Sequence, residues 1–131
     1  MSANAGVGPI EFDNINPTYS GLFRTFSAQR LFTALGNNIM QVRFFVPGTS
    51  TPATTNGFGA VFTDVDRPGT RIDYFDERGE RLARVEVPAI PGRQTLSFLG
   101  VRFLNRRVAR VRIKSGNLAL GRTSAGTAIS W

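Results

Sequence analysis

The sequence has no cysteine and no histidine among its 131 residues. The lack of cysteine excludes a disulfide framework, a thiol nucleophile, a zinc ribbon and an iron–sulfur cluster. The lack of histidine excludes a Ser-His-Asp triad and an imidazole that could bind a metal or act as a base near neutral pH. These absences remove most catalytic mechanisms, so we expect a protein that binds a partner and is not an enzyme.

Long hydrophobic runs are also missing. No stretch approaches the ~18 apolar residues of a membrane-spanning helix, and the opening MSANAGVGPI lacks the basic and apolar regions of a signal peptide. The hydrophobic fraction of 41% and the charged fraction of 19% are typical of a globular protein. We therefore expect one domain over residues 1–131, with residues 1–8 as a flexible N-terminal segment and no membrane span.

Acidic side chains are absent from the last part of the chain. Eight of the 16 basic residues lie between Arg93 and Trp131 without any Asp or Glu, so the net charge of +7 arises there. This asymmetry indicates a polyanion partner such as nucleic acid, anionic lipid or acidic polysaccharide. The alternative is that arginine only covers the solvent-exposed faces of strands. The polyanion patch would consist of Arg106, Arg107, Arg110, Arg112 and Lys114.

The remaining pattern predicts an all-β protein. Gly and Pro divide the chain into short segments in which apolar and polar residues alternate with a period of two. Strands with this spacing form an antiparallel two-sheet β-sandwich, jelly-roll-like, with roughly eight to nine short strands. Asp76–Gly79 has the chemistry of a tight hairpin turn, and only Ser27–Gly36 carries a weak helical pattern. The expected strands are Ile10–Asp13, Leu22–Thr33, Met40–Val46, Gly57–Phe62, Arg71–Phe75, Arg81–Pro88, Gln94–Phe103, Val108–Lys114 and Thr127–Trp131.

Several runs between Ile39 and Gly121 resemble a group of exported bacterial proteins of uncharacterised function. The runs include GFGAVFTDVD, YFDERGE and ARVRIKSGN, which correspond to a strand, a hairpin and a late strand in that group. The resemblance implies a β-sandwich similar to carbohydrate-binding modules and a secreted or cell-envelope location. In similar proteins the last strand carries a pair of Asp residues, which Thr127–Trp131 lacks.

Aromatic and polar residues are the candidates for binding a glycan. Phe45 and Phe75 each lie opposite the main apolar set of their strand, on the faces that carry Arg43 and Arg71. Such rings stack on the apolar side of a sugar, although rings in a sandwich are also commonly buried. The loop from Pro47 to Gly57 adds hydroxyl groups and one amide. The candidate ligand-binding residues are therefore Phe45, Phe75, Arg43, Arg71 and Asn56.

Two carboxylates raise the possibility of a calcium site. Asp64 and Asp66 stand two residues apart after the Gly57–Phe62 strand and so share a face if the strand continues. Calcium needs six to eight oxygen ligands, part of which two such carboxylates could supply. The alternative is a turn at Asp66–Gly69, set by Pro68 and Gly69. No other cofactor is expected.

Three functions stay open. The leading one is a non-catalytic extracellular or cell-envelope binding module for carbohydrate. The second is a structural or adhesion domain that docks another protein or self-associates through a face or an exposed edge strand. The third is a basic binder of single-stranded nucleic acid, in which alternating Arg110, Arg112 and Lys114 follow the backbone. Nucleic acid is the less favoured partner because no recognisable binding signature accompanies these residues.

Overall fold

The computed structural model describes residues 18, 32–34, 36–118 and 128–130, and the only regular structure in these residues is β-strand. Most of the segments Leu22–Thr33 and Ser27–Gly36, all of Ile10–Asp13 and the N-terminal segment 1–8 lie outside the described residues. The strands are β1 (Ile39–Phe45), β2 (Pro52–Ala53), β3 (Gly57–Thr63), β4 (Arg71–Phe75), β5 (Arg81–Glu86), β6 (Leu96–Arg102), β7 (Arg110–Lys114) and β8 (Ala128–Ser130).

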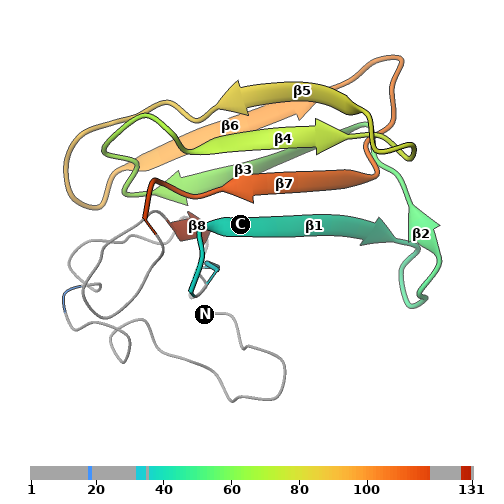
Figure 1. Cartoon of the computed structure of the whole chain (residues 1–131), viewed down its shortest axis with the longest axis horizontal. Helices are drawn as coiled ribbons and strands as arrows, with labels where there is room; N and C mark the ends of the chain where they lie inside the picture. The colour runs from blue at the N-terminus through green and yellow to red at the C-terminus, as the bar shows by residue number, and fades with distance from the viewer. Residues whose placement is uncertain (1–17, 19–31, 35, 119–127, 131) are drawn as a thin grey trace.

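The strands form two antiparallel sheets that lie in two layers (Figure 1). The five-stranded sheet has the order β2-β1-β7-β4-β5, and the three-stranded sheet has the order β6-β3-β8. Phe32 extends the smaller sheet because an antiparallel bridge pairs it with Ile129 of β8, with N···O distances of 2.7 and 2.9 Å.

The strand order is that of a jelly roll. With the two-residue β2 set aside and Phe32 counted as the first strand, one sheet reads first-eighth-third-sixth and the other second-seventh-fourth-fifth. Consecutive strands thus cross repeatedly between the sheets, as two Greek keys require. The expected all-β, jelly-roll-like sandwich is confirmed.

The core lies between the sheets, because alternate residues of both sheets are apolar and point inward. Tyr74 of β4 joins the layers: its hydroxyl donates to the Phe58 carbonyl at 3.1 Å, and its ring meets the edge of Phe103 at a centroid distance of 5.5 Å. The fully buried cluster consists of Ala60, Phe62, Val65, Ile72, Tyr74, Val87, Val108, Val111, Ile113 and Ile129. The other residues of each strand form an outer face on each sheet.

The hairpin between β4 and β5 follows the expected turn chemistry. The Asp76 carboxylate accepts hydrogen bonds from the backbone N–H groups of Arg78 and Glu80, both at 2.9 Å. Gly79 has a φ of 82°, a left-handed conformation that glycine adopts without strain. Partial desolvation acts to raise the pKa of Asp76, but these N–H groups and Arg106 outweigh it and hold the pKa below its ordinary value.

The connection between β1 and β3 contains a short strand. The segment expected to be only a loop between Pro47 and Gly57 contains β2, which pairs Pro52 and Ala53 with the end of β1.

Within the described part of the chain, no helix has the length and apolar character needed to cross a membrane.

Candidate functional site

The outer face of the five-stranded sheet is lined by basic side chains from β1, β7, β4 and β5. Register places Arg43 directly opposite Arg110, and Lys114 directly opposite Arg71. Residues that the sequence assigned to two separate sites, a glycan site and a polyanion patch, therefore share one surface. We call this surface the cationic face; its members are Arg43, Arg71, Arg84, Arg110, Arg112 and Lys114.

Asp73 of β4 stands at the centre of the cationic face. Its side chain is 2% exposed. Arg84 from β5 donates its Nε to Oδ1 at 2.6 Å and its Nη2 to Oδ2 at 3.2 Å, and Arg112 from β7 donates two hydrogen bonds to Oδ2 at 3.3 and 3.0 Å. Burial alone would raise the pKa of Asp73, but the hydrogen bonds and charges of these two arginines hold it below its ordinary value. Asp73 therefore stays ionised at neutral pH and fixes two guanidinium groups in place.

Phe75 supports a third arginine. Its ring points outward as expected but is only 8% exposed, because the Arg110 guanidinium lies 4.1 Å from the ring centroid and that of Arg112 lies 5.4 Å away. A cation over an aromatic face is attracted by the ring quadrupole. A ligand on this face would thus meet the Arg110 guanidinium and not the ring of Phe75.

The cationic face is only partly neutralised. Among the described residues, no carboxylate lies within salt-bridge distance of Arg43, Arg110 or Lys114. The directly opposed pairs Arg43–Arg110 and Lys114–Arg71 carry like charges, which destabilise a sheet, although Arg71 also has Glu86 opposite it on β5. A bound anion would relieve this repulsion.

A pocket opens at the end of the cationic face where β1 leads into β2. Its volume is about 290 Å³, near the lower end of the ~300–1,000 Å³ range of ligand sites. Phe45, whose side chain is 49% exposed, forms one wall together with Arg43. Thr54 and Glu77 contribute an oxygen-bearing side chain each. The full lining is Arg43, Phe44, Phe45, Pro52, Ala53, Thr54, Glu77 and Ala109.

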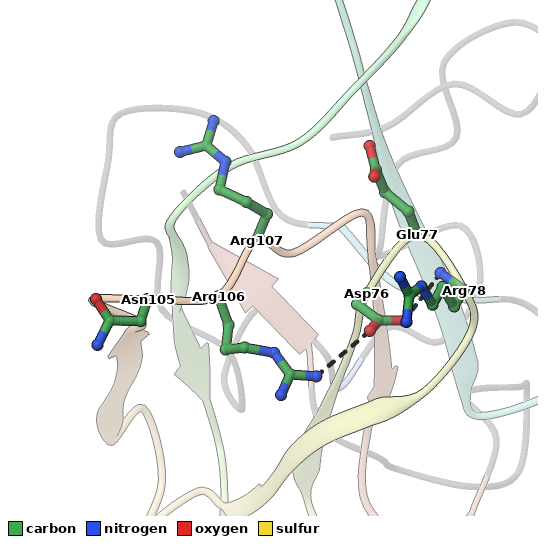
Figure 2. A pocket seen from close by; sticks show the side chains of 6 residues that line it. All are labelled: Asp76, Glu77, Arg78, Asn105, Arg106 and Arg107. Atoms are coloured by element: carbon green, nitrogen blue, oxygen red, sulfur yellow. Dashed lines mark hydrogen bonds and ion pairs between the residues drawn. The ribbon is translucent and has the colours of Figure 1, made fainter.

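A second, smaller pocket of about 180 Å³ shares Glu77 with the first and is lined by the residues drawn in Figure 2. Arg106 crosses it to Asp76 and Glu80, with N···O distances of 3.5 and 3.4 Å. Arg107 points away from this ion pair (Figure 2), and it donates to the Thr54 hydroxyl at 3.2 Å. These two arginines of the expected polyanion patch therefore lie on the loops beside the cationic face.

Asn56 lies at the same end of the molecule. Its side chain is exposed, and its backbone carbonyl accepts a hydrogen bond from the N–H of Phe103 at 2.7 Å. It is not among the residues that line either pocket.

Asp64 and Asp66 follow β3, at the opposite end of this strand from Asn56. Asp64 has a φ of 63° and is 8% exposed. Burial, together with the negative charge of Asp66, raises the pKa of Asp64 to about 6, although Arg93 opposes the shift. The Asp66 carboxylate accepts the N–H of Gly92 at 3.1 Å, which ties two connections together. In the part of the chain that the structure describes, no three His, Cys, Asp or Glu side chains gather closely enough to hold a metal ion.

Asp73, Arg84 and Glu77 were not among the site residues predicted from the sequence, whereas Thr54 belongs to the Pro47–Gly57 loop whose hydroxyl groups were expected to bind. Arg84 could have been found, because the β4–β5 turn fixes the hairpin register, and that register places Arg84 opposite Asp73. Glu77 carries no such signal, since only the fold brings its hairpin loop next to Thr54.

Comparison of the chain with protein-family models, with curated proteins and with solved structures finds no match.

Proposed function

We propose that the protein is a non-catalytic binding module, extracellular or in the cell envelope, whose ligand is an acidic glycan bearing sulfate or uronate groups. The observation that carries the proposal is the cationic face, which continues into a pocket with an exposed aromatic ring. The proposed extracellular or cell-envelope location of the protein rests on the resemblance of the GFGAVFTDVD and ARVRIKSGN runs to exported proteins.

An anion is the ligand class that this surface favours. Guanidinium groups present a planar set of donors that matches carboxylate and sulfate oxygens. Arg84 and Arg112 are held by Asp73, and Arg110 is held by Phe75, so little side-chain entropy remains to be lost on binding. A bound anion would also reduce the repulsion within the like-charged pairs, which a neutral ligand would not do.

A sugar fits the pocket better than a nucleic acid. Non-specific binders of single strands stack successive bases on several aromatic rings. On the cationic face Phe75 is covered by Arg110, and of the two rings that line the pocket Phe44 packs against the core and Phe45 is exposed. The Glu77 carboxylate beside Phe45 can accept hydrogen bonds from sugar hydroxyls. Phe45 would stack on the sugar ring while Arg43 meets its acidic group.

The chemistry of the site supports binding and not hydrolysis. A glycosidase needs one carboxylic acid with a raised pKa close to a second carboxylate. Asp73, the most buried acid of the cationic face, has a lowered pKa and both of its oxygens engaged by arginine. It cannot donate a proton at neutral pH.

The test is a binding titration of the purified chain with a sulfated and a neutral oligosaccharide of equal length, near physiological salt. We expect the sulfated sugar to bind and its affinity to fall as salt rises, since screening weakens exposed charge pairs. Replacing both Arg43 and Arg110 with glutamine should weaken binding at least about tenfold, which corresponds to about 1.4 kcal/mol.

The matched control is Arg102→Gln, which removes a positive charge from an exposed residue of β6 in the other sheet. Its affinity should stay within about twofold of the wild-type protein. Equal losses in the Arg43/Arg110 variant and the Arg102 control would contradict the proposal. So would preferential binding of a single-stranded oligonucleotide, which would support the nucleic-acid function, or of the neutral sugar with no dependence on salt.

A further inference from the structure

Three of the four sheet edges carry features that prevent pairing with another chain. The β2 edge is only two residues long and begins with Pro52. The β8 edge is already bridged by Phe32. The β5 edge has a register shift opposite Tyr74 and Phe75 and three charged side chains. Short length, proline, bulges and charges are the devices by which proteins block edge-to-edge association.

The β6 edge has only one of these devices, the charge of Arg102 at its last residue. The strand is seven residues long and pairs on one side with β3, and in the described part of the chain no strand pairs with its other side. Every residue from Gln94 to Val101 is uncharged, and proline is absent from the strand. Phe98 points outward from this strand with 68% of its side chain exposed. β6 is thus a long edge that is uncharged up to Arg102, in a strongly basic protein.

Hydrogen bonding shows which backbone groups face this edge. Phe103 donates its N–H to Asn56, and Thr95 accepts from the N–H of Asp64, at 2.7 and 3.0 Å. Because bonded and non-bonded pairs alternate along an antiparallel ladder, the odd-numbered residues of β6 bond to β3. The N–H and C=O groups that point to the open edge are those of Leu96, Phe98, Gly100 and Arg102.

We propose that β6 pairs antiparallel with β6 of a second copy of this chain, about a two-fold axis at Leu99. This register bonds all four outward residues of each strand, because Leu96 then faces Arg102 of the second copy and Phe98 faces Gly100. The Phe98 ring lies over Gly59 and Gly100 of its own chain, where a Cβ on Gly100 would stand 2.7 Å from Phe98 Cζ, so the ring leans toward β3 and leaves the outward backbone groups of β6 accessible. The surface is therefore complementary to itself, as a two-fold interface requires.

The second copy is favoured because the outward backbone groups of β6 pair with themselves about Leu99, and the uncharged stretch from Gln94 to Val101 limits the repulsion between two basic chains. A protein of net charge +7 repels another copy unless the contact avoids its basic surface. β6 is a stretch where two copies can meet without opposing arginines, since Leu96 of one strand faces Arg102 of the other. The two-fold axis of such a pair stands perpendicular to the joined sheet. Both cationic faces therefore lie on the same side of the dimer, which would let one glycan chain bind two sites.

The test measures mass against protein concentration, by light scattering or sedimentation, up to about 1 mM, the weak limit of specific association. The wild-type protein should approach twice the monomer mass. Phe98→Lys and Phe98→Asp should each stay monomeric, because each places two like charges at diagonal positions across the new pair. An equimolar mixture of the two variants should dimerise again, which a folding defect could not produce.

Leu118→Lys is the matched control, since Leu118 is 61% exposed and lies after β7, outside the paired edge. It should dimerise like the wild-type protein. Amide exchange at Leu96, Phe98, Gly100 and Arg102 should slow as the dimer forms. A wild-type chain that stays monomeric, or a mixture that associates no better than either Phe98 variant alone, would overturn the proposal. Glycan binding by such a monomer would leave the proposed function intact.

Discussion

The two outer faces of the sandwich differ in chemistry although one core supports both. The outer face of the five-stranded sheet carries basic side chains arranged around Asp73. The outer face of the three-stranded sheet carries Gly57, Gly59 and Gly100, with the exposed ring of Phe98 lying over the last two. The difference teaches that alternation sets which residues face outward, while strand order determines which of them become neighbours.

The same contrast appears in two buried carboxylates. Asp73 and Asp64 are both almost inaccessible, at 2% and 8% exposure. Arginines on both sides outweigh the burial of Asp73 and lower its pKa, whereas burial and the nearby Asp66 raise the pKa of Asp64 to about 6. The two acids should therefore give the protein opposite dependences on pH.

Asp73→Asn should produce the largest effect. It leaves Arg84 and Arg112 next to each other without their shared carboxylate, and we expect a loss of about 3 kcal/mol at pH 7, the low end for a broken buried pair because both arginines are partly exposed. Denaturant unfolding measures this loss. The pKa of Asp73 in the folded protein lies below its unfolded value of 3.8. The stability that Asp73 provides is therefore fully present above pH 3.8 and is lost as the pH falls through the lowered pKa.

Two observations check this assignment. The difference between the wild-type protein and Asp73→Asn should shrink in acid. Glu86→Gln removes an exposed carboxylate of β5 and should change stability by less than about 0.5 kcal/mol. A Glu86 effect as large as that of Asp73 would show that total charge, and not the arginine contacts of Asp73, governs the stability of the cationic face.

Asp64→Asn should produce a smaller effect of opposite sign. Because its folded-state pKa lies above 3.8, wild-type stability should fall as pH rises from 3.8 to about 6 and then level off. The amide removes this dependence, so the variant should be more stable than the wild-type protein at pH 8. We expect a gain of about 2 kcal/mol, because the raised pKa measures how strongly the folded protein disfavours the charged carboxylate. Unfolding curves at several pH values measure the difference.

Asp66→Asn serves as the control for that profile. It removes the neighbouring charge that contributes to the raised pKa of Asp64, so the transition should move to lower pH without disappearing. An Asp64→Asn profile parallel to that of the wild-type protein would contradict the assignment of this dependence to Asp64.

Much of the fold could be predicted because alternation and turn chemistry are local. The segments around β1, β3, β4, β5, β6, β7 and β8 were all expected as strands, and the Asp76–Gly79 turn was expected between β4 and β5. β2 was not expected, because a two-residue strand within a loop of Pro, Thr and Ser has no period to detect. Its pairing with β1 depends on the tertiary fold.

The candidate site was predictable only in part. The outward directions of Arg43, Arg71 and Phe75 follow from their strands. The count of charges along the chain, however, placed the net positive charge after Arg93 and so left Arg43 and Arg71 out of the polyanion patch. In the sheet β7 lies between β1 and β4, so its basic residues stand beside Arg43 and Arg71. The open edge of β6 was likewise hidden, because edge position depends on the order of strands in the sheet.

The most direct test of the contrast between the two faces is a titration followed by backbone amide NMR, with a sulfated oligosaccharide at physiological salt. We predict shifts for residues of β1, β4 and β7 and for the loop around Glu77, with no saturating shifts in β3 or β6. Saturating shifts confined to β3 and β6, or no shifts on the cationic face at concentrations where the sugar binds, would contradict this assignment of function.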